Sequence, residues 1–426
     1  MERSAIVSGT ALKILRFVRS LWIRVALISV LALLASGLAM AFETILPEAL
    51  RQRFGTDAVM PVLKILASGM LAVSTFSLNV MVTAHHAAAA QATPRAHRIL
   101  LNDTVTHTAL ATFIGAFVYS LSSIILVQAG LHAEGSAVIL MGMTVLVVVL
   151  VILAMLRWID RLSDLGSMDA TLRKTDEEAR ASLMTTRQSP ALTATPLTGD
   201  TVIPPDAKPL PAPNSGYIQV MNLPHIDDCL PGAAARVWFT TPPGTFVLKG
   251  QTVGHVAGLD EDQIEQVQAG LTIGEFRTFE QDATYGLLVL SEIASRALSP
   301  GINDPGTAID VVGRQERLLW EWATTPRNDD APAYTRIFVT EVSPESLVEY
   351  AFAGVARDGA GHLEVQRRVL HALDALQDAG NDRMARAARD WARHTFDYGQ
   401  SALAIEWERA RMKKTYEDAF GASASP

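Results

Sequence analysis

Four long apolar segments dominate the first 160 residues of the chain. Each approaches or exceeds the roughly 20 mostly apolar residues that a helix needs to cross a bilayer. A cleaved signal peptide is the competing interpretation of the first segment, because Ala39, Met40 and Ala41 have the small-x-small form of a cleavage site. We expect a membrane domain of four transmembrane helices over residues 1–160. The predicted spans are Val25–Phe42, Pro61–Ala84, Thr106–Ala129 and Ser136–Leu156.

Basic residues gather on one side of these spans. They precede the first span, separate the second from the third as Arg95 and Arg98, and follow the fourth. The opposite loops contain Arg51 and Arg53 alone. Because Lys and Arg favour the cytoplasmic side of a membrane, we expect a bacterial inner (plasma) membrane protein whose N- and C-termini are both cytoplasmic. Everything after residue 157 is then cytoplasmic.

The second and third spans each carry polar residues along one face. The residues recur at steps of seven, four and four in the second span and at steps of four in the third, so each set shares one side of its helix. Two interpretations stay open. Either these groups hydrogen-bond between packed helices, or several subunits gather them around a central pore. The residues are Ser68, Thr75, Asn79 and Thr83 in the second span, and Thr104, Thr108 and Thr112 in the third.

The composition changes repeatedly after the fourth span. Residues 161–215 read as a charged connector helix followed by a Pro-rich segment, which is either an exposed linker or an extended edge. Short β-branched and aromatic runs between Pro and Gly turns predict a small β barrel or sandwich over residues 216–258. Its strands are expected at Tyr217–Val220, Arg236–Thr240, Thr245–Val247 and Thr252–Val256. Residues 259–426 are expected to be helical. The predicted fold class is an α-helical integral membrane protein with a cytoplasmic α+β portion.

A sharp break interrupts the helical pattern near residue 300. Apolar residues at spacings of three and four predict a helix that reaches Ala297. Pro300 and Gly301 end this helix. Asn303 or Asp304 can then cap a second helix, with a proline at its first position, where the missing N–H costs nothing.

Charged and amide side chains are concentrated around this break, as an acid/base or metal site would require. However, Glu292 and Arg296 are four residues apart, the spacing of an ordinary helical ion pair, and no nucleophile elbow, phosphate-binding loop or zinc motif is present. We therefore expect a hinge, a subunit interface or a ligand contact, and no catalytic residue, cofactor or metal ligand. The residues concerned are Arg277, Asp282, Glu292, Arg296, Ser299, Pro300, Gly301, Asn303, Asp304 and Pro305.

The composition and charge of the chain indicate which classes of partner molecule to expect. The 426 residues are 49% hydrophobic, and the formal charge is −8 without any cluster of Lys and Arg. Nucleic acid is therefore not an expected partner, because phosphate neutralisation needs clustered basic side chains. Cys229 is the single cysteine, so no intrachain disulfide can form.

Several stretches of sequence carry a resemblance to a known family. These are the run Arg296–Pro305, the residues Gly274, Arg277, Gln281 and Asp282 that precede it, and the segment Phe113–Ser120 of the third predicted span. They resemble a bacterial family known as predicted membrane proteins of unknown function, over nearly the whole chain. The resemblance implies an architecture and supplies no reaction or cofactor.

The patterns together favour a homo-oligomeric channel or transporter-like protein whose cytoplasmic domain assembles or gates the spans. The expected partners are the lipid bilayer, further copies of the chain and a small solute or ion. The alternative is a non-conducting, membrane-anchored module that binds a ligand or signals. A membrane-bound enzyme is the third hypothesis.

Overall fold

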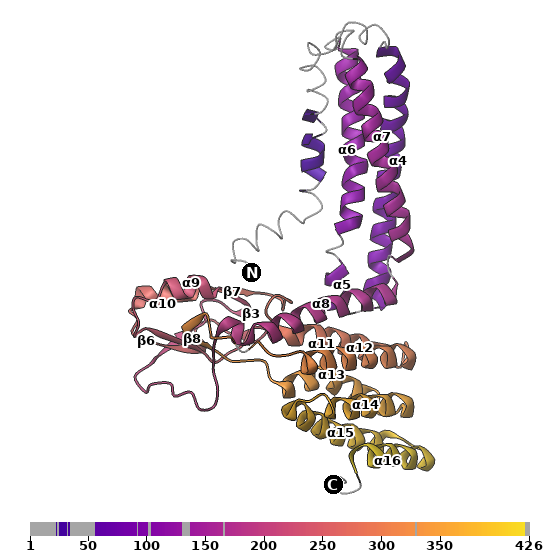
Figure 1. Cartoon of the computed structure of the whole chain (residues 1–426). Helices are drawn as coiled ribbons and strands as arrows, with labels where there is room; N and C mark the ends of the chain where they lie inside the picture. Colours follow the sequence, from indigo (N-terminus) through magenta and orange to yellow (C-terminus); the bar gives the residue numbers. More distant parts are fainter. Residues whose placement is uncertain are drawn as a thin grey trace. The chain divides into compact units, whose positions relative to one another are not determined.

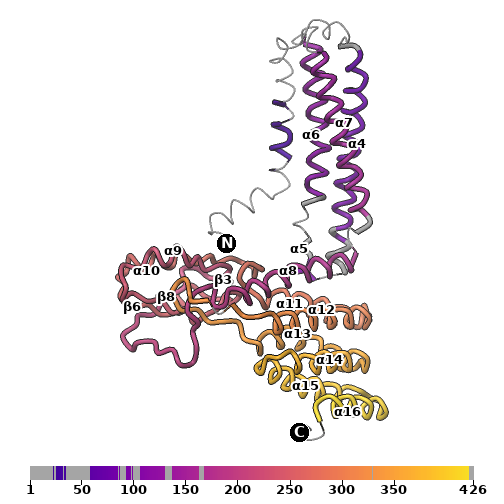
Figure 2. Tube along the Cα trace, in the orientation of Figure 1, coloured from indigo at the N-terminus to yellow at the C-terminus, as the bar shows by residue number. Residues whose placement is uncertain are grey.

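The structure is a computed structural model that describes residues 23, 25–31, 33–34, 56–91, 93–100, 104–129, 137–164, 167–328 and 330–421. The chain divides into two compact units, shown as a ribbon in Figure 1 and as a trace in Figure 2. The first, which we call the membrane unit, ends at Thr171. The second, which we call the C-terminal unit, starts at Leu172 and contains every sheet found among the described residues.

The described part of the membrane unit is mainly helical. Its longer elements are α4 (Thr56–Gln91), α5 (Pro94–Leu100), α6 (Thr104–Gln128) and α7 (Ala137–Asp164). Within the described residues three helices are long and apolar enough to cross a membrane, over Ala58–Ala84, Thr106–Gln128 and Ala137–Leu162. They match the second, third and fourth predicted spans. Of the first predicted span, residues 25–31 and 33–34 are helical, and its remaining residues lie outside those described.

Apolar side chains hold these helices together. Leu63 on α4, Tyr119 on α6 and Leu140 on α7 belong to one buried cluster. Ile28, from the first predicted span, approaches α6 so closely at Gly115 that a Cβ there would collide with it. By contrast, α7 carries many exposed apolar side chains, as a surface that meets lipid requires. Its exposed residues include Val145, Leu146, Val149, Leu150, Ile152 and Leu153.

The C-terminal unit contains two sheets. The five-stranded sheet has the order β1-β8-β4-β6-β2, in which β8 lies parallel to both β1 and β4, and the other pairs are antiparallel. The three-stranded sheet has the antiparallel order β5-β3-β7. The strands are β1 (Ala194–Pro196), β2 (Lys208–Pro211), β3 (Gly216–Met221), β4 (Arg236–Phe239), β5 (Phe246–Val247), β6 (Thr252–Ala257), β7 (Leu271–Gly274) and β8 (Tyr334–Val339).

The prediction of a small β domain confined to residues 216–258 was too narrow. The four predicted strands are present, but the sheets also recruit β1 and β2 from the Pro-rich segment and β7 and β8 from the region expected to be helical. The Pro-rich strands occupy the two outer positions of the five-stranded sheet. Proline lacks the N–H that an inner strand must donate, so it is tolerated at such edges. The extended-edge interpretation of this segment was correct.

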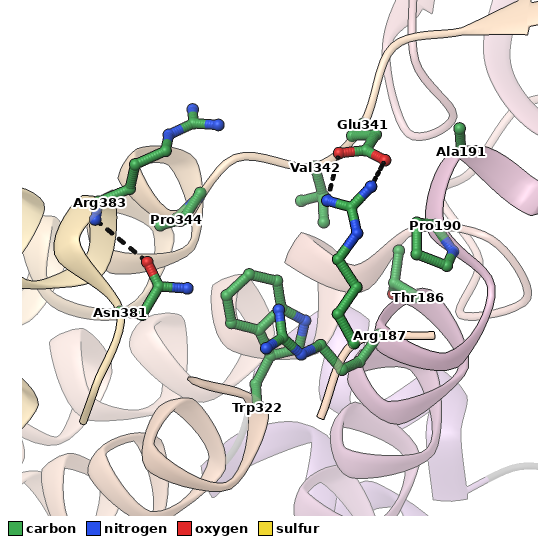
Figure 3. Close-up of a pocket in the computed structure, with 11 residues that line it drawn as sticks. Thr186, Arg187, Pro190, Ala191, Trp322, Glu341, Val342, Pro344, Asn381 and Arg383 are labelled. Carbon is green, nitrogen blue, oxygen red and sulfur yellow. Dashed lines mark hydrogen bonds and ion pairs between the residues drawn. The ribbon is translucent and has the colours of Figure 1, made fainter. Parts of the chain in front are cut away.

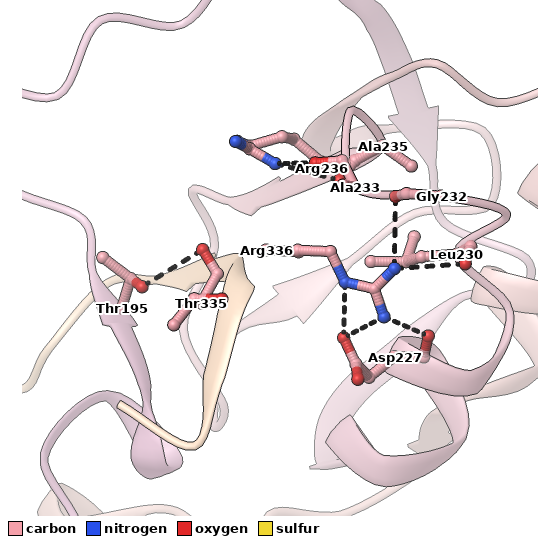
Figure 4. Close-up of polar contacts among 9 residues, drawn as sticks. All are labelled: Thr195, Asp227, Leu230, Gly232, Ala233, Ala235, Arg236, Thr335 and Arg336. Atoms are coloured by element: carbon pink, nitrogen blue, oxygen red, sulfur yellow. Dashed lines mark hydrogen bonds and ion pairs between the residues drawn. The ribbon is translucent and has the colours of Figure 1, made fainter. Parts of the chain in front are cut away.

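Arg336 on β8 ties the sheet to the short helix α9 (Leu223–Asp228) (Figure 4). Its guanidinium donates to the Asp227 carboxylate at 2.8 and 3.1 Å and to the carbonyl oxygens of Asp227, Leu230 and Gly232. One planar group thus binds the Asp227 carboxylate together with carbonyl oxygens in α9 and in the turn that follows it. Leu223 in α9 and Val267 in α10 (Glu261–Ala269) join the core that the sheets bury.

The six helices from α11 to α16 form stacked pairs (Figure 1). α11 contacts α13, which contacts α15, while α12 contacts α14, which contacts α16. Each pair therefore covers the apolar face of the preceding one, as in helical solenoids. The helix α8 (Met168–Gln188) joins α12 through the ion pairs Asp176–Arg317 and Arg180–Glu321. The six are α11 (Ala283–Ala297), α12 (Pro305–Thr324), α13 (Pro344–Asp358), α14 (Leu363–Gln377), α15 (Asp382–Ala402) and α16 (Glu406–Phe420).

Candidate functional site

The polar residues of the second span form an exposed stripe on α4. Ser68, Thr75, Asn79 and Thr83 are all exposed. At about 100° per residue, the centre of this stripe lies roughly 180° around the helix from the face that packs against the other helices of the chain. That packed face consists of Val59, Leu63, Leu66, Met70, Ser77 and Met81. We call these four residues the α4 stripe; among the described residues, they lie outside the face of α4 that packs within one copy of the chain.

Two hydroxyls of the α4 stripe are satisfied by their own helix. Ser68 donates to the carbonyl oxygen of Lys64 at 3.0 Å, and Thr75 donates to that of Leu71 at 2.9 Å. Such bonds let Ser and Thr face lipid at little cost. Asn79 is different, because its amide has two N–H donors and a carbonyl acceptor to satisfy. An amide left without hydrogen bonds in an apolar medium costs several kcal/mol.

The polar residues of the third span are divided between two environments. Thr104 begins α6, Thr108 is exposed, and Thr112 is half-buried and donates to the carbonyl oxygen of Thr108 at 2.8 Å. Further along the same helix, Tyr119 is buried and its hydroxyl lies 3.1 Å from that of Thr144 on α7. Toward the C-terminal end of α6, this face therefore packs against another helix of the same chain. The helix α4 remains the better candidate to line a polar path.

A buried ion pair lies at the start of α11 in the C-terminal unit. Arg277 donates from Nε to Oδ2 of Asp282 at 2.7 Å and from Nη2 to Oδ1 at 2.8 Å. Asp282 also caps α11, because it accepts the backbone N–H groups of Thr284 and Tyr285. The rings of Tyr285 and Tyr350 lie against the guanidinium, with their centroids 5.4 and 5.1 Å from its carbon. Two aromatic faces and one carboxylate thus surround this cation.

Burial and charge act in opposite directions on Arg277. Burial lowers its pKa, but the hydrogen bonds and the negative charge of Asp282 outweigh burial, so the pKa of Arg277 is raised above its ordinary value. Gly244 completes the packing around Asp282. It adopts the left-handed backbone region with φ of +88°, and a Cβ there would collide with the carboxylate. The two hydrogen bonds, the helix cap and the contact with Gly244 hold the pair in place.

The break at residues 299–305 is a hydrogen-bonded turn. The backbone N–H groups of Ile302 and Asn303 donate to the Ser299 carbonyl, and that of Asp304 donates to the Ala297 carbonyl at 2.8 Å. Asn303, with φ of +50°, is the left-handed residue of the turn. The predicted cap is resolved in favour of Asp304, which accepts the backbone N–H of Thr307 at 3.1 Å and precedes Pro305. Pro300 and Gly301 are exposed.

The structure does not bring the predicted motif residues into one site. Arg277 and Asp282 lie at the start of α11, whereas Ser299, Asn303 and Asp304 follow its end. The helix has 15 residues, which is about 22 Å at 1.5 Å per residue. Glu292 and Arg296, half-buried, lie between them along α11. No single substrate-sized group can contact both ends.

Sequence reasoning missed two neighbours of the ion pair. Gly244 precedes Asp282 by 38 positions, and Tyr350 follows Arg277 by 73. The Pro-Gly turn at Pro243 was the only local signal for the first, and nothing local indicated the second. Among the described residues, no group of three or more His, Cys, Asp or Glu side chains is placed to hold a metal ion.

One known family covers both the candidate membrane helices and most of the C-terminal unit. The family described as "Predicted membrane protein (DUF2254)" matches residues 18–375. The chain belongs to the DUF2254 family. The matched residues include the described spans, the buried ion pair and the break. Membership supports association with a lipid bilayer and names no substrate.

Related DUF2254 chains are bacterial. The chain is 28% identical over 276 residues to an uncharacterised protein of Mycobacterium tuberculosis and, at the same identity, to one of Mycobacterium bovis. The aligned residues are 59% of this chain and 50% of each relative, so the chain spans about half the length of the curated relatives it matches. No solved structure matches the chain.

Proposed function

We propose that this DUF2254 protein is a homo-oligomeric channel or transporter-like protein of the bacterial inner membrane, in which several copies of α4 line a path for a small solute or ion. The C-terminal unit lies in the cytoplasm in this proposal and assembles or gates the spans. The cytoplasmic placement of both termini follows from the distribution of Lys and Arg beside the spans.

The observation that carries the proposal is the position of the α4 stripe. A polar face that points away from the helix partners of its own chain faces lipid, a second copy or water. Three or four spans are too few to enclose a wide path, so a path lined by such a face requires several copies around a symmetry axis. The exposed apolar side chains of α7, and those of α4 such as Leu71 and Phe76, are suited to lipid or to a second copy of the chain.

Depth in the membrane makes Asn79 the most informative residue of the α4 stripe. The span Ala58–Ala84 is centred near Leu71, so Asn79 lies about 12 Å from the middle at 1.5 Å per residue. This is within the half-thickness of about 15 Å of a hydrocarbon core. An amide at this depth gains from a partner on another copy or from water in a path. Both solutions place copies of Asn79 near one another.

The C-terminal unit is connected closely enough to influence the spans. α7 ends at Asp164 and α8 begins at Met168, so three residues separate them. α8 is in turn joined to α12 by two ion pairs. In this proposal a displacement of the stacked helices reaches the last span through α8, as a gating domain requires.

Cross-linking tests the arrangement directly, because the chain has one native cysteine. In a Cys229→Ser background, Asn79→Cys is expected to give disulfide-linked dimers when the protein is oxidised in membranes. Leu78→Cys is the matched control, since Leu78 is exposed but lies about 100° around α4 from Asn79. Equal cross-linking at the two positions would remove the support for a shared α4 axis.

Flux measurements then separate a path from mere helix packing. Purified protein in liposomes is expected to conduct at least one of potassium, sodium, chloride or phosphate, and Asn79→Leu is expected to change that flux while Leu78→Ala does not. If Asn79→Cys cross-links but no ion passes in any of these assays, the α4 stripe is a packing surface. The non-conducting, membrane-anchored binding module is then the better assignment.

A further inference from the structure

A pocket of about 110 Å³ lies in the C-terminal unit, and its lining does not include either residue of the buried ion pair (Figure 3). Four longer helices have an end at its wall. α8 and α12 terminate there, while α13 and α15 begin there. The residues that line it are Thr186, Arg187, Pro190, Ala191, Trp322, Arg327, Glu341, Val342, Pro344, Asn381 and Arg383.

The lining carries more positive than negative charge. Three of the lining residues are arginines and one is a glutamate. Arg327 pairs with Glu341 at 2.7 and 3.1 Å. Arg383 pairs with Glu345 outside the pocket lining, at 2.8 and 3.2 Å. The two pairs are partly exposed, so an incoming anion can share these guanidinium groups with their carboxylates at modest cost.

Arg187 and Trp322 form one wall of the pocket. The guanidinium carbon of Arg187 lies 4.8 Å from the centre of the indole ring, and Figure 3 shows the two groups overlapping. Arg187 also donates to the Thr325 carbonyl at 2.7 Å. This contact offsets the negative end of the α12 dipole, which would otherwise repel an anion. Trp322 is 5% exposed, and its Nε1 has no hydrogen-bond acceptor within the described residues.

The N-termini of α13 and α15 add partial positive charge from the opposite wall. Pro344 is the first residue of α13, and Asn381 caps α15 by accepting the N–H groups of Arg383 and Met384 at 3.1 Å. These bonds occupy the side-chain oxygen Oδ1 of Asn381 and leave the side-chain NH₂ group to donate. Helix N-termini combined with Arg side chains are a common means of binding anions.

The backbone that closes the pocket is strained. Ala191, Leu192 and Thr193 have consecutive φ values of +48°, +58° and +68°, a left-handed turn without any glycine. Each such residue costs of order 1 kcal/mol or more. Ala191 is a lining residue and is buried. The surrounding packing keeps this turn in place, and strain of this kind concentrates at ligand sites.

We propose that this pocket binds a small anion of the phosphate class, either inorganic phosphate or the phosphoryl group of a small molecule or lipid headgroup. Its volume is well below the several hundred Å³ of sites for drug-sized ligands, so it suits one phosphoryl group and not a nucleotide. The fork geometry of Arg matches phosphate oxygens bidentately. This site is independent of the proposed conduction path.

The test is calorimetric titration of the full-length protein in detergent with inorganic phosphate and, separately, with glycerol 3-phosphate. Arg383→Gln is expected to weaken binding at least about tenfold, the effect of losing one charge-assisted hydrogen bond. Glu341→Gln is expected to strengthen binding severalfold, because it removes the one negative charge of the lining. Arg357→Gln is the matched control, since Arg357 is an exposed arginine paired with Asp358 outside the lining.

The two titrants distinguish the sources of the phosphoryl group. Equal affinity indicates free phosphate, and clearly tighter binding of glycerol 3-phosphate indicates a phosphate ester, carried by a small molecule or a lipid headgroup; both results support the proposal. No saturable binding of either titrant at millimolar concentration overturns it. The same holds if Arg383→Gln and Glu341→Gln both bind as the unmodified protein does. The paired charge changes keep the test decisive if one variant fails to fold.

Discussion

The buried pair Arg277–Asp282 offers the sharpest test of what stabilises the C-terminal unit. The side chains are 9% and 4% exposed and are joined by two hydrogen bonds. Arg277→Met removes the cation while keeping an unbranched side chain against the rings of Tyr285 and Tyr350. Asp282→Asn removes the anion while keeping a residue that caps a helix about as well as Asp does. Each change therefore removes the ion pair while it largely keeps the helix cap and the volume of the side chain.

The expected magnitude follows from the geometry. Removal of one partner of a buried pair leaves the other charge uncompensated and costs about 3–5 kcal/mol. For a unit of this size, 1 kcal/mol lowers the melting temperature by about 2–4 °C, so either single change should lower it by roughly 6–20 °C. The double variant has no unpaired charge. It should be destabilised by clearly less than the sum of the two single effects, with a coupling of about 2 kcal/mol or more.

The measurement is thermal unfolding of the full-length protein, followed through limited proteolysis of the C-terminal unit during a temperature ramp. Arg357→Gln is the control, because its partner Asp358 lies next to it on the exposed end of α13. Strict additivity of the single effects, or a shift from Arg277→Met no larger than that from the control, would refute the view that this pair holds the start of α11.

Two further predictions concern the same unit. Asp304→Ala should cost about 1 kcal/mol through loss of the α12 cap, whereas Asp310→Ala, exposed on the same helix, should cost less. The Thr307 hydrogen bonds lower the pKa of Asp304, so this stabilisation is present above the unfolded pKa of about 3.9 and disappears as the pH falls through the lower folded pKa; a cost unchanged at pH 2 would contradict the cap. Gly244→Ala should be strongly destabilising because of its positive φ and the collision with Asp282. Part of that cost should vanish in an Asp282→Ala background, and melting temperatures that show no such relief would count against the contact.

Local patterns in the sequence predicted many of the elements of the fold, although they missed four of the strands. Apolar length identified the second, third and fourth spans, because the bilayer imposes a minimum length on any crossing helix. The break was located correctly, since Pro305 and the cap Asp304 act within one helical turn. The polar residues of α4 were assigned to one face, because helical periodicity determines direction.

Those local patterns did not predict contacts between residues that are far apart in the sequence. Tyr350 meets Arg277 because α13 packs on α11, and neither helix carries a sequence signal for that partner. The β region was predicted too small for the same reason, since β8 is separated from β4 by about 100 residues. From the sequence, Arg277 and Asp304 were grouped in one motif around residue 300, but these residues lie at opposite ends of α11. Proximity along a sequence says little when a straight helix intervenes.

The position of β8 has a consequence for how the chain matures during synthesis. This strand lies between β1 and β4 and is made only after α11 and α12. While a ribosome is still translating residue 330, β1 has no strand beside it and β4 has an open edge. Exposed edges of this kind recruit other chains. The nascent sheet is therefore at risk of aggregation until β8 has been translated. A chain that stops before β8 leaves the edge of β4 unpaired and able to bind another chain.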